Sequence, residues 1–460
     1  MHPAPSSPAA APVPGPVRFG ELRGLPVVGK LLDFRRDRLG LHDECARTGD
    51  IVRFPMLTRH VYCISSPELV PALLVDNQDA FVKAPGLATY GRALLGDGLL
   101  TAEGDRHRRE RKLLAPAFAP RRIAAYGDVM AGLTERMAAS WRDGQGLDVA
   151  AEMMHLTLAI VGRTLFDADI GGDAAVVGEA LTEGMEFMID RLSLPLPMTW
   201  PLPSNKRMAA AVARLDDVVF RIIAERRAAP GDRGDVMSML LEARDDDGGG
   251  MTDQDVRDEI MTLMLAGHET TANALAWTWY LLSQHPTAYD RLCAEVDQVL
   301  GGRTPTVADL PRLPWALQVI EEAMRLYPPA YVTARMATRP VRIGPVEVQP
   351  REVVMVTIRG IHRRPDLWPE PGVFRPDRFR EDAKRARPRY HYMPFGAGPR
   401  ICIGNHFALQ EAHLIVATLA QRWRFRLMQP ADIEPEPLVT LRPRGGVHVE
   451  AIARRPAARA

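Results

Sequence analysis

The chain has 460 residues, of which 46% are hydrophobic and 25% charged, so it can build a large core and is not a disordered protein. Its 58 basic and 57 acidic residues nearly cancel, and no overall field favours nucleic acid or an anionic membrane as a partner. The 4 cysteines show neither disulfide-scaffold nor zinc-site spacing, which favours a reducing cytoplasm. No apolar run is long enough to cross a bilayer, so we expect a soluble protein without a membrane anchor.

The chain begins with MHPAPSSPAAAPVPGP, which has neither the basic start nor the apolar stretch of a signal peptide. Because proline and alanine alone cannot build a core, we predict a disordered tail over residues 1–16 and a single domain over 17–460. The first strand signals follow, since apolar and polar residues alternate at Ile51–Phe54 and at His60–Ile64. This pattern predicts two strands joined by a turn.

Helix-compatible spacing of apolar residues dominates the middle and the end of the chain. The longest predicted helix begins at Thr252, which forms a capping-box pattern with Asp255, and ends at Gln284 before Pro286. At 1.5 Å per residue it would be roughly 50 Å long and would cross the whole molecule. The shorter predicted helices are Arg108–Leu114, Arg121–Trp141, Asp148–Leu165, Asn205–Arg227, Thr287–Leu300 and Phe407–Trp423.

Strand signals return at Val341–Ile358, where apolar residues alternate around a glycine and a proline. This pattern predicts a hairpin followed by a further strand. We expect the two distant strand regions, roughly 17–80 and 330–360, to share one small sheet. The predicted fold class is therefore mainly α with a minor β region.

The most informative segment is FGAGPRICIG at Phe395–Gly404, in which one cysteine follows a glycine-rich loop and precedes a helical pattern. Gly396 and Gly398 let the chain turn tightly and let backbone N–H groups approach the sulfur of Cys402. Arg400 adds the positive charge that a thiolate needs nearby. On its own, a lone cysteine in such a turn is more often a buried, inert thiol.

The whole segment, however, resembles the haem-binding signature of the cytochrome P450 superfamily, and further signatures follow in the expected order. The resemblance implies the family fold, a triangular helical lobe plus a small β-rich lobe, with haem b between the long central helix and the cysteine loop. It implies that Cys402 is the iron ligand, whose electron donation favours cleavage of the O–O bond. Phe395, Arg400 and Gly404 are then cofactor-binding residues, with Arg400 on a haem propionate.

A second pattern lies on a predicted helix, Pro314–Leu326, where Glu322 and Arg325 are three residues apart and share one face. Alone, this is a solvated ion pair of little energetic value. Downstream, FRPDRF at Phe374–Phe379 supplies Arg378 and resembles the family's meander motif. The resemblance implies a buried triad that braces the core behind the haem loop, so that removal of one partner would leave an unpaired buried charge.

The third pattern is LAGHETTA at Leu265–Ala272, in the middle of the long helix. Gly267 and two threonines weaken the helix locally and favour an opening of its hydrogen-bond ladder. In the family this region holds dioxygen, and the resemblance implies that Glu269 and Thr270 are the catalytic pair that delivers protons. His268 is a tempting metal ligand, but it has no partner at zinc spacing, so we interpret it as a packing group.

A fourth match is EGDRHRRERKLLAPAF at Glu103–Phe118, which resembles the family helix that contacts the haem propionates. His107 and Arg111 are one helical turn apart, so both can reach a propionate. Arg335, in YVTARMATRP, is a further candidate for this role. A solvated basic face is the alternative for all three.

The same helix and the residues after it are strongly basic. Such a run is usually just solvated, but in the family fold it borders the proximal face. We therefore expect it to dock an acidic electron donor of the ferredoxin or flavodoxin type, which works with its own reductase, through steered and salt-sensitive association. The basic residues are Arg106, Arg108, Arg109, Arg111, Lys112, Arg121 and Arg122.

Four segments approach the distal side of the haem by analogy with the fold, and all are rich in leucine, methionine, alanine and proline. They predict a pocket for a hydrophobic small molecule such as a terpenoid, a fatty-acid-like compound or a polyketide. Ordinary core packing explains many of the same residues. The segments are Phe81–Leu99, Phe187–Met198, Met261–Ala266 and Ala330–Thr333.

Together these patterns predict a haem-thiolate monooxygenase that uses dioxygen to hydroxylate or epoxidise its substrate. The alternatives are a peroxygenase that uses hydrogen peroxide, a haem-thiolate isomerase, and a haem protein that binds a ligand without catalysis. The pair Glu269 and Thr270 disfavours all three, because a proton relay serves dioxygen activation.

Overall fold

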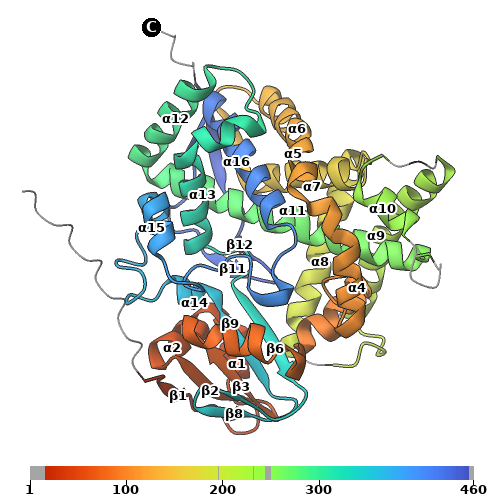
Figure 1. The fold of residues 1–460 in the computed structure, drawn as a ribbon, viewed down its shortest axis with the longest axis vertical. Helices are drawn as coiled ribbons and strands as arrows, with labels where there is room; N and C mark the ends of the chain where they lie inside the picture. Colours follow the sequence, from red (N-terminus) through yellow and green to blue (C-terminus); the bar gives the residue numbers. More distant parts are fainter. Residues whose placement is uncertain (1–15, 195, 230, 232, 244–249, 455–460) are drawn as a thin grey trace, which may run out of the picture.

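The computed structural model describes residues 16–194, 196–229, 231, 233–243 and 250–454. The predicted tail, apart from Pro16, lies outside the described residues. Helices make up most of the described chain, and the strands gather mainly in a β-rich lobe at one end of the molecule (Figure 1). The predicted fold class, mainly α with a minor β region, is confirmed.

A six-stranded sheet forms the core of the β-rich lobe, with the order β1-β2-β3-β9-β6-β4. The predicted pair of early strands is confirmed, since β2 and β3 are antiparallel neighbours. Strand β3 in turn pairs with β9 in parallel, with Val61 opposite Val353. The two distant strand regions therefore do share one sheet. The strands are β1 (Phe19–Glu21), β2 (Ile51–Met56), β3 (Arg59–Ile64), β4 (Phe81–Lys83), β6 (Val332–Ala337) and β9 (Val353–Thr357).

Further strands complete the fold, and all of them except β7 and β8 lie outside the ranges that the sequence indicated. A three-stranded sheet has the order β10-β13-β5 and closes the far end of the helical lobe. A small hairpin, β11-β12, reaches back toward the centre of the molecule (Figure 1). The predicted hairpin after residue 340 is present as β7-β8. These strands are β5 (Gln145–Asp148), β7 (Val341–Ile343), β8 (Val346–Val348), β10 (Trp423–Leu427), β11 (Pro435–Pro437), β12 (Leu441–Pro443) and β13 (His448–Ala453).

The central helix α11 (Asp253–Gln284) crosses the molecule, as predicted (Figure 1). Its capping box is confirmed, because the side chain of Thr252 accepts from the N–H of Asp255 while the Asp255 carboxylate accepts from the N–H of Thr252. The helix runs through its middle without a break, contrary to the expected opening of the ladder. A Cβ on Gly267 would lie 2.9 Å from Val161, so this glycine serves the close packing of α11 against α7.

The other helices surround α11. The helix expected at Arg121–Trp141 is divided at Tyr126 into α5 and α6, and the helices that were not predicted are α1, α2, α3, α8, α10, α14 and α15. The helices are α1 (Leu31–Arg36), α2 (Arg38–Thr48), α3 (Arg92–Leu95), α4 (Gly104–Leu114), α5 (Pro120–Ala125), α6 (Gly127–Ser140), α7 (Val149–Leu165), α8 (Ala174–Ser193), α9 (Pro203–Ala228), α10 (Val236–Glu242), α12 (Pro286–Leu300), α13 (Pro314–Leu326), α14 (Ile358–His362), α15 (Glu381–Ala386) and α16 (Asn405–Arg422).

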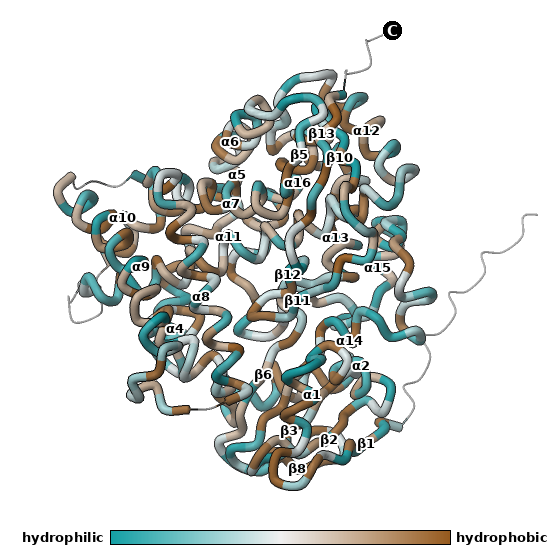
Figure 2. The backbone as a smooth tube through the Cα atoms, turned by 180° about the vertical axis from the view of Figure 1, so that it is seen from behind, coloured by the Kyte–Doolittle hydropathy of each residue, from teal (hydrophilic) through white to brown (hydrophobic). Residues whose placement is uncertain are grey.

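One large apolar core fills the helical lobe, and smaller cores lie against the faces of the six-stranded sheet. Figure 2 shows apolar segments along the strands of the β-rich lobe, whereas α4 is among the most hydrophilic helices. None of the helices among the described residues is long and apolar enough to cross a membrane.

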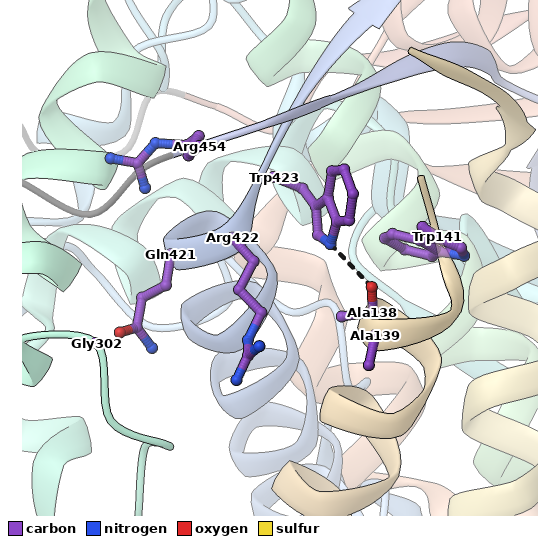
Figure 3. A pocket seen from close by; sticks show the side chains of 8 residues that line it. All are labelled: Ala138, Ala139, Trp141, Gly302, Gln421, Arg422, Trp423 and Arg454. Atoms are coloured by element: carbon purple, nitrogen blue, oxygen red, sulfur yellow. Dashed lines mark hydrogen bonds between the residues drawn. The ribbon is translucent and has the colours of Figure 1, made fainter. Parts of the chain in front are cut away.

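A cavity of about 310 Å³ lies between the ends of α6 and α16 and the last strand (Figure 3). Trp423 projects toward α6, and its Nε1 donates to the carbonyl of Ala138. The two arginines that line the cavity are already in ion pairs, since Arg422 pairs with Glu135 and Arg454 pairs with Asp297. No predicted site residue lines this cavity.

Candidate active site

The cysteine loop precedes α16 and is closed by its own backbone. The N–H of Cys402 donates to the carbonyl of Phe395 at 3.0 Å. Gly398 adopts φ +74°, and a Cβ there would lie 2.1 Å from the carbonyl oxygen of Leu74, so only glycine fits. Cys402 is exposed, yet burial under the surrounding protein raises the pKa of its thiol, against the opposing effects of the Gly404 N–H and of Arg111.

Glu322 and Arg325 lie behind this loop on α13, and neither side chain has exposed surface. The carboxylate of Glu322 accepts from Nε and Nη2 of Arg325 at 2.7 and 2.8 Å, and from the N–H of Arg375 at 2.9 Å. Nε of Arg378 lies 3.4 Å from the same carboxylate. The structure therefore brings the three residues of the predicted triad together.

A chain of hydrogen bonds connects this ion pair to the cysteine loop. Arg325 donates through Nη1 to the carbonyl of His362 at 2.9 Å. The imidazole of His362 is neutral, because burial and then the charge of Arg325 lower its pKa to about 3. Its Nε2 can therefore accept from the N–H of Met393 at 3.0 Å, and the carbonyl of Met393 accepts from Gly396. The ion pair is thus connected to the segment Met393–Gly396, which leads into the cysteine loop.

Cationic side chains gather on the sheet edge that faces the loop. Lys83 on β4 and Arg335 on β6 stand directly opposite each other in the antiparallel ladder, an arrangement that is destabilising for like charges. Arg400, from the cysteine loop, forms an ion pair with Glu103 and donates to the carbonyl of Ala102 at 3.0 Å. The amino group of Lys83 also donates to Ala102.

The pKa values of this group show how crowded its positive charges are. Burial, and then the charge of Arg400, lower the pKa of Lys83 to about 7 and that of Arg335 to about 10. Burial lowers the pKa of His107 to about 4, with Arg400 and Lys83 as further causes. Glu103 is the acidic neighbour that Lys83 and Arg335 share. The cluster therefore fits a bound group with two carboxylates, and the two propionates of a haem meet this requirement.

Arg111 lies between the cysteine loop and the cationic cluster. Its Nη1 donates to the carbonyl of Ile401 at 2.8 Å, and its charge is also one of those that lower the pKa of His107. From there its charge favours the thiolate form of Cys402. His107, one turn earlier on α4, is buried next to the cationic cluster.

The middle of α11 carries the two predicted catalytic residues, Glu269 and Thr270. Ala266 is exposed although its neighbour Leu265 is buried, and Thr270, one turn later on the same face, is half-buried. Oγ1 of Thr270 donates to the carbonyl of Ala266 at 2.7 Å. The interpretation of His268 as a packing group agrees with its burial, its bond to Met264 and the lack of any metal-ligand cluster within the described ranges.

Glu269 lies on a different face from Thr270 and is 1% exposed. Burial raises the pKa of its carboxyl to about 7. Oγ1 of Thr440 donates to its Oε1 at 2.6 Å, whereas its Oε2 is buried without a hydrogen-bond partner among the described residues. The structure therefore does not join Glu269 to Thr270 directly, but it gives Glu269 the pKa of a group that exchanges protons near neutral pH.

Sequence analysis missed two residues of this site, Lys83 and Thr440. Lys83 was included only as part of a predicted substrate segment, and no local pattern marked it. Thr440 lies 171 residues from Glu269 in the chain. The pairing of β4 with β6 places Lys83 next to Arg335, and the return of the β11-β12 hairpin to α11 places Thr440 next to Glu269.

Comparison with known proteins agrees with this site. The family model for Cytochrome P450 matches residues 20–449. Cyclooctatin synthase from Streptomyces melanosporofaciens is 39% identical over 423 residues, which cover 91% of this chain and 92% of the relative. Cyclooctat-9-en-7-ol 5-monooxygenase from the same organism is 36% identical, with 91% and 92% covered. Pentalenene oxygenase from Streptomyces avermitilis is 32% identical, with 91% and 93% covered.

The fold and the site thus define a haem-thiolate enzyme. The chain belongs to the cytochrome P450 family and is a monooxygenase with haem b as its cofactor. The resemblance seen in the sequence is confirmed.

Proposed function

We propose that this chain hydroxylates or epoxidises a terpenoid, with electrons that a separate redox partner supplies. The observation that carries the proposal is the similarity, over about nine-tenths of the chain, to two relatives that are named as a monooxygenase and an oxygenase of terpenoids. Fatty-acid-like and polyketide substrates also suit an apolar pocket and are the alternatives that the substrate assay separates.

We propose the following roles for the residues of the site. A bound haem supplies the iron at which dioxygen is activated. Cys402 provides the thiolate ligand, and Arg111 with the N–H of Gly404 stabilises its negative charge. His107, Arg335, Arg400 and Lys83 hold the propionates. Phe395 and Gly404 shape the cysteine loop.

Two residues of α11 handle the proton in this proposal. Thr270 presents an alcohol on the accessible face of the helix, and Glu269 takes up and releases a proton near neutral pH. Glu322, Arg325 and Arg378 act on neither substrate nor cofactor. Their proposed role is to hold the chain that enters the cysteine loop.

Two of the predicted substrate segments, Phe81–Leu99 and Phe187–Met198, contact each other. A Cβ on Gly91 would lie 3.2 Å from Cε of Met188, and one on Gly86 would lie 3.0 Å from the side chain of Leu192. Residues Gly86–Gly91 form a π-helical turn, a feature frequent at functional sites. Methionine adapts to irregular apolar shapes, so a contact of this kind suits a bulky hydrocarbon.

A spin-state assay tests the substrate class. Purified holoenzyme is titrated with cyclic terpene hydrocarbons and alcohols, with fatty acids and with polyketide lactones. We expect a low-spin to high-spin shift with the terpenes, and product formation when dioxygen and an electron donor are supplied. A shift with fatty acids or polyketides alone would contradict the terpenoid proposal. Turnover with hydrogen peroxide that exceeds turnover with donor and dioxygen would favour the peroxygenase alternative.

The surface of α4 and α5 supports a separate electron donor. Arg106 pairs with Glu110 and Asp255, whereas Arg108 forms an exposed ion pair with Asp105 that leaves its charge accessible to a partner. Nη1 of Arg122 donates to the carbonyl of Gly234. Three exposed cations keep no ion pair with any residue that the structure describes. They are Arg109, Lys112 and Arg121.

We propose that these three cations steer an acidic ferredoxin or flavodoxin to the side of the molecule that carries the cysteine loop. Charge reversal at Lys112 and Arg109 should slow reduction by an acidic ferredoxin and weaken its dependence on ionic strength, as stopped-flow absorbance would show. Arg23, exposed in the β-rich lobe, gives the control reversal, which should have no effect. Equal rates for all three variants would refute this docking site.

We further propose that the protein lies in the cytoplasm, since none of its cysteines forms a disulfide.

A further inference from the structure

Hydrogen bonds with three other residues hold the β11-β12 hairpin against the middle of the molecule. Trp277 of α11 donates through Nε1 to the carbonyl of Leu441 at 3.0 Å. The hydroxyl of Tyr331 donates to the carbonyl of Leu438 at 2.9 Å, and the N–H of Leu441 donates to Pro329 at 2.9 Å. Thr440, between these anchors, is 6% exposed. Its side chain is therefore held in one place against α11.

The hydroxyl of Thr440 has a fixed direction. Nδ2 of Asn273 donates to Oγ1 of Thr440 at 3.1 Å, and Oγ1 of Thr440 lies 2.6 Å from Oε1 of Glu269. Asn273 is one helical turn after Glu269, so both side chains lie on the face that meets the hairpin. Because an amide N–H can only donate, the hydroxyl oxygen accepts from Asn273 and its single proton is directed to Glu269.

This arrangement distinguishes the two oxygens of the Glu269 carboxyl. Oε1 accepts the bond from Thr440, so it is the carbonyl-like oxygen when the acid is neutral. Oε2 has no partner among the described residues and is the oxygen left to carry the proton. Arg442 is the charged group that acts on Glu269, and it is itself paired with Glu436 at 3.1 Å and with Glu186 at 3.7 Å.

We propose that Thr440 and Asn273 are positioning residues for proton delivery, which keep Oε1 of Glu269 occupied so that the proton is exchanged at Oε2. The inference rests on the proposed role of Glu269 as a proton donor. In the step, the O–H bond at Oε2 breaks and its proton passes to a water molecule on the Thr270 side of α11. The carboxylate then takes back one proton from bulk water. No bond to Thr440 forms or breaks in the step.

The geometry has a consequence for the vibrations of the carboxyl group. A hydrogen bond to a carbonyl oxygen lowers the C=O stretching frequency, so the protonated form of Glu269 should absorb at a lower frequency with Thr440 than without it. Infrared difference spectra between low and high pH, with E269Q to assign the band, measure this directly. T440V removes the hydroxyl but keeps the shape, and it should move the band to higher frequency. T440S should restore it.

The same variants should change the coupling of electrons to product. A hydrogen bond of this kind is typically worth a factor of about 2 to 12, and we expect T440V to lower product per electron pair several-fold while peroxide release rises. The solvent isotope effect on turnover should increase, since proton delivery becomes slower. N273L, which leaves Thr440 in place but frees its hydroxyl to rotate, should show the same changes to a smaller extent. The matched control is T278V, since Thr278 is a buried threonine of α11 whose hydroxyl donates to Ala274.

The outcomes separate the two proposals. If T440V and T278V leave both the Glu269 band and the coupling unchanged, Thr440 merely packs and the inference is wrong. If the band moves in T440V but E269Q itself changes neither coupling nor the isotope effect, the hydrogen bond exists but Glu269 is not the proton donor. If the E269Q effects are present and T440V reproduces part of them with a shifted band, both proposals stand. N273L and T440S decide the matter if T440V does not fold.

Discussion

Replacement of Glu322 by alanine tests how much the buried ion pair contributes to the haem-binding fold. The substitution removes two hydrogen bonds to Arg325 and one to the N–H of Arg375, and it leaves the guanidinium of Arg325 in a site with no exposed surface. Breaking a buried pair by removing one partner typically costs about 3 to 5 kcal/mol. Arg325 keeps bonds to the carbonyls of His362 and Pro371, so we expect about 3 kcal/mol, the lower end of that range.

Denaturant unfolding of the holoenzyme, followed by haem content per purified chain, measures this loss. The matched control is E381A on α15, where Glu381 and Arg385 form an ion pair with both side chains largely exposed. Such a surface pair contributes about 0.5 kcal/mol or less, so the control should retain its stability and haem. If Glu322→Ala loses no more stability than Glu381→Ala and binds haem normally, the path from the ion pair through His362 to the cysteine loop is refuted.

Two further predictions concern buried charges, one at Glu259 on α11 and one at Lys83 in the cationic cluster. Burial and then the charge of Glu110 raise the pKa of Glu259 from 4.5 to about 8, so the folded state binds this proton more tightly and stability falls as pH rises toward 8. E259Q should remove a decline of about 3 kcal/mol between pH 6 and 9 in urea unfolding, and an unchanged pH profile would contradict this reasoning. K83M should lose haem to a competing apoprotein about tenfold faster than wild type, because one of the cations facing the propionates is absent. K206M, at an exposed position of α9, should not, and equal rates in both variants would exclude Lys83 from haem binding.

Local patterns in the sequence were sufficient for the parts of the site that lie on one segment. The loop around Cys402 is defined by glycines at fixed spacing, and Gly398 proves to be required by the approach of Leu74. Glu322 and Arg325 are three residues apart on one helix, so their contact follows from helical geometry alone. The capping pattern at Thr252 similarly located the start of the central helix.

Contacts between distant segments could not be read in this way. Lys83 meets Arg335 only because β4 pairs with β6, and Thr440 meets Glu269 only because a hairpin near the end of the chain returns to α11. Arg111 was assigned to a propionate from its place on a helix, but its reach to Ile401 depends on how α4 packs against the loop. Arg106 of α4 likewise pairs with Asp255 of α11, a partner that its own segment does not reveal.

Several elements were not predicted from the local sequence. The helix expected at Phe407–Trp423 is present as α16, Asn405–Arg422, but the strand β10 that follows it was not predicted. Strand pairing of β10 with β13 then decides the conformation. Helix α8 was not predicted as a helix, although its end falls in a predicted substrate segment.

The central claim is that Cys402 holds the haem iron, and the absorption spectrum of the reduced, carbon-monoxide-bound protein tests it most directly. A thiolate ligand displaces the Soret band to long wavelength, and we predict this band for wild type and for C293S, whose thiol is buried elsewhere in the helical lobe. C402S should lose the displaced band even if it retains haem. A C402S protein with the wild-type spectrum, or a wild-type protein without the displaced band, would contradict the assignment.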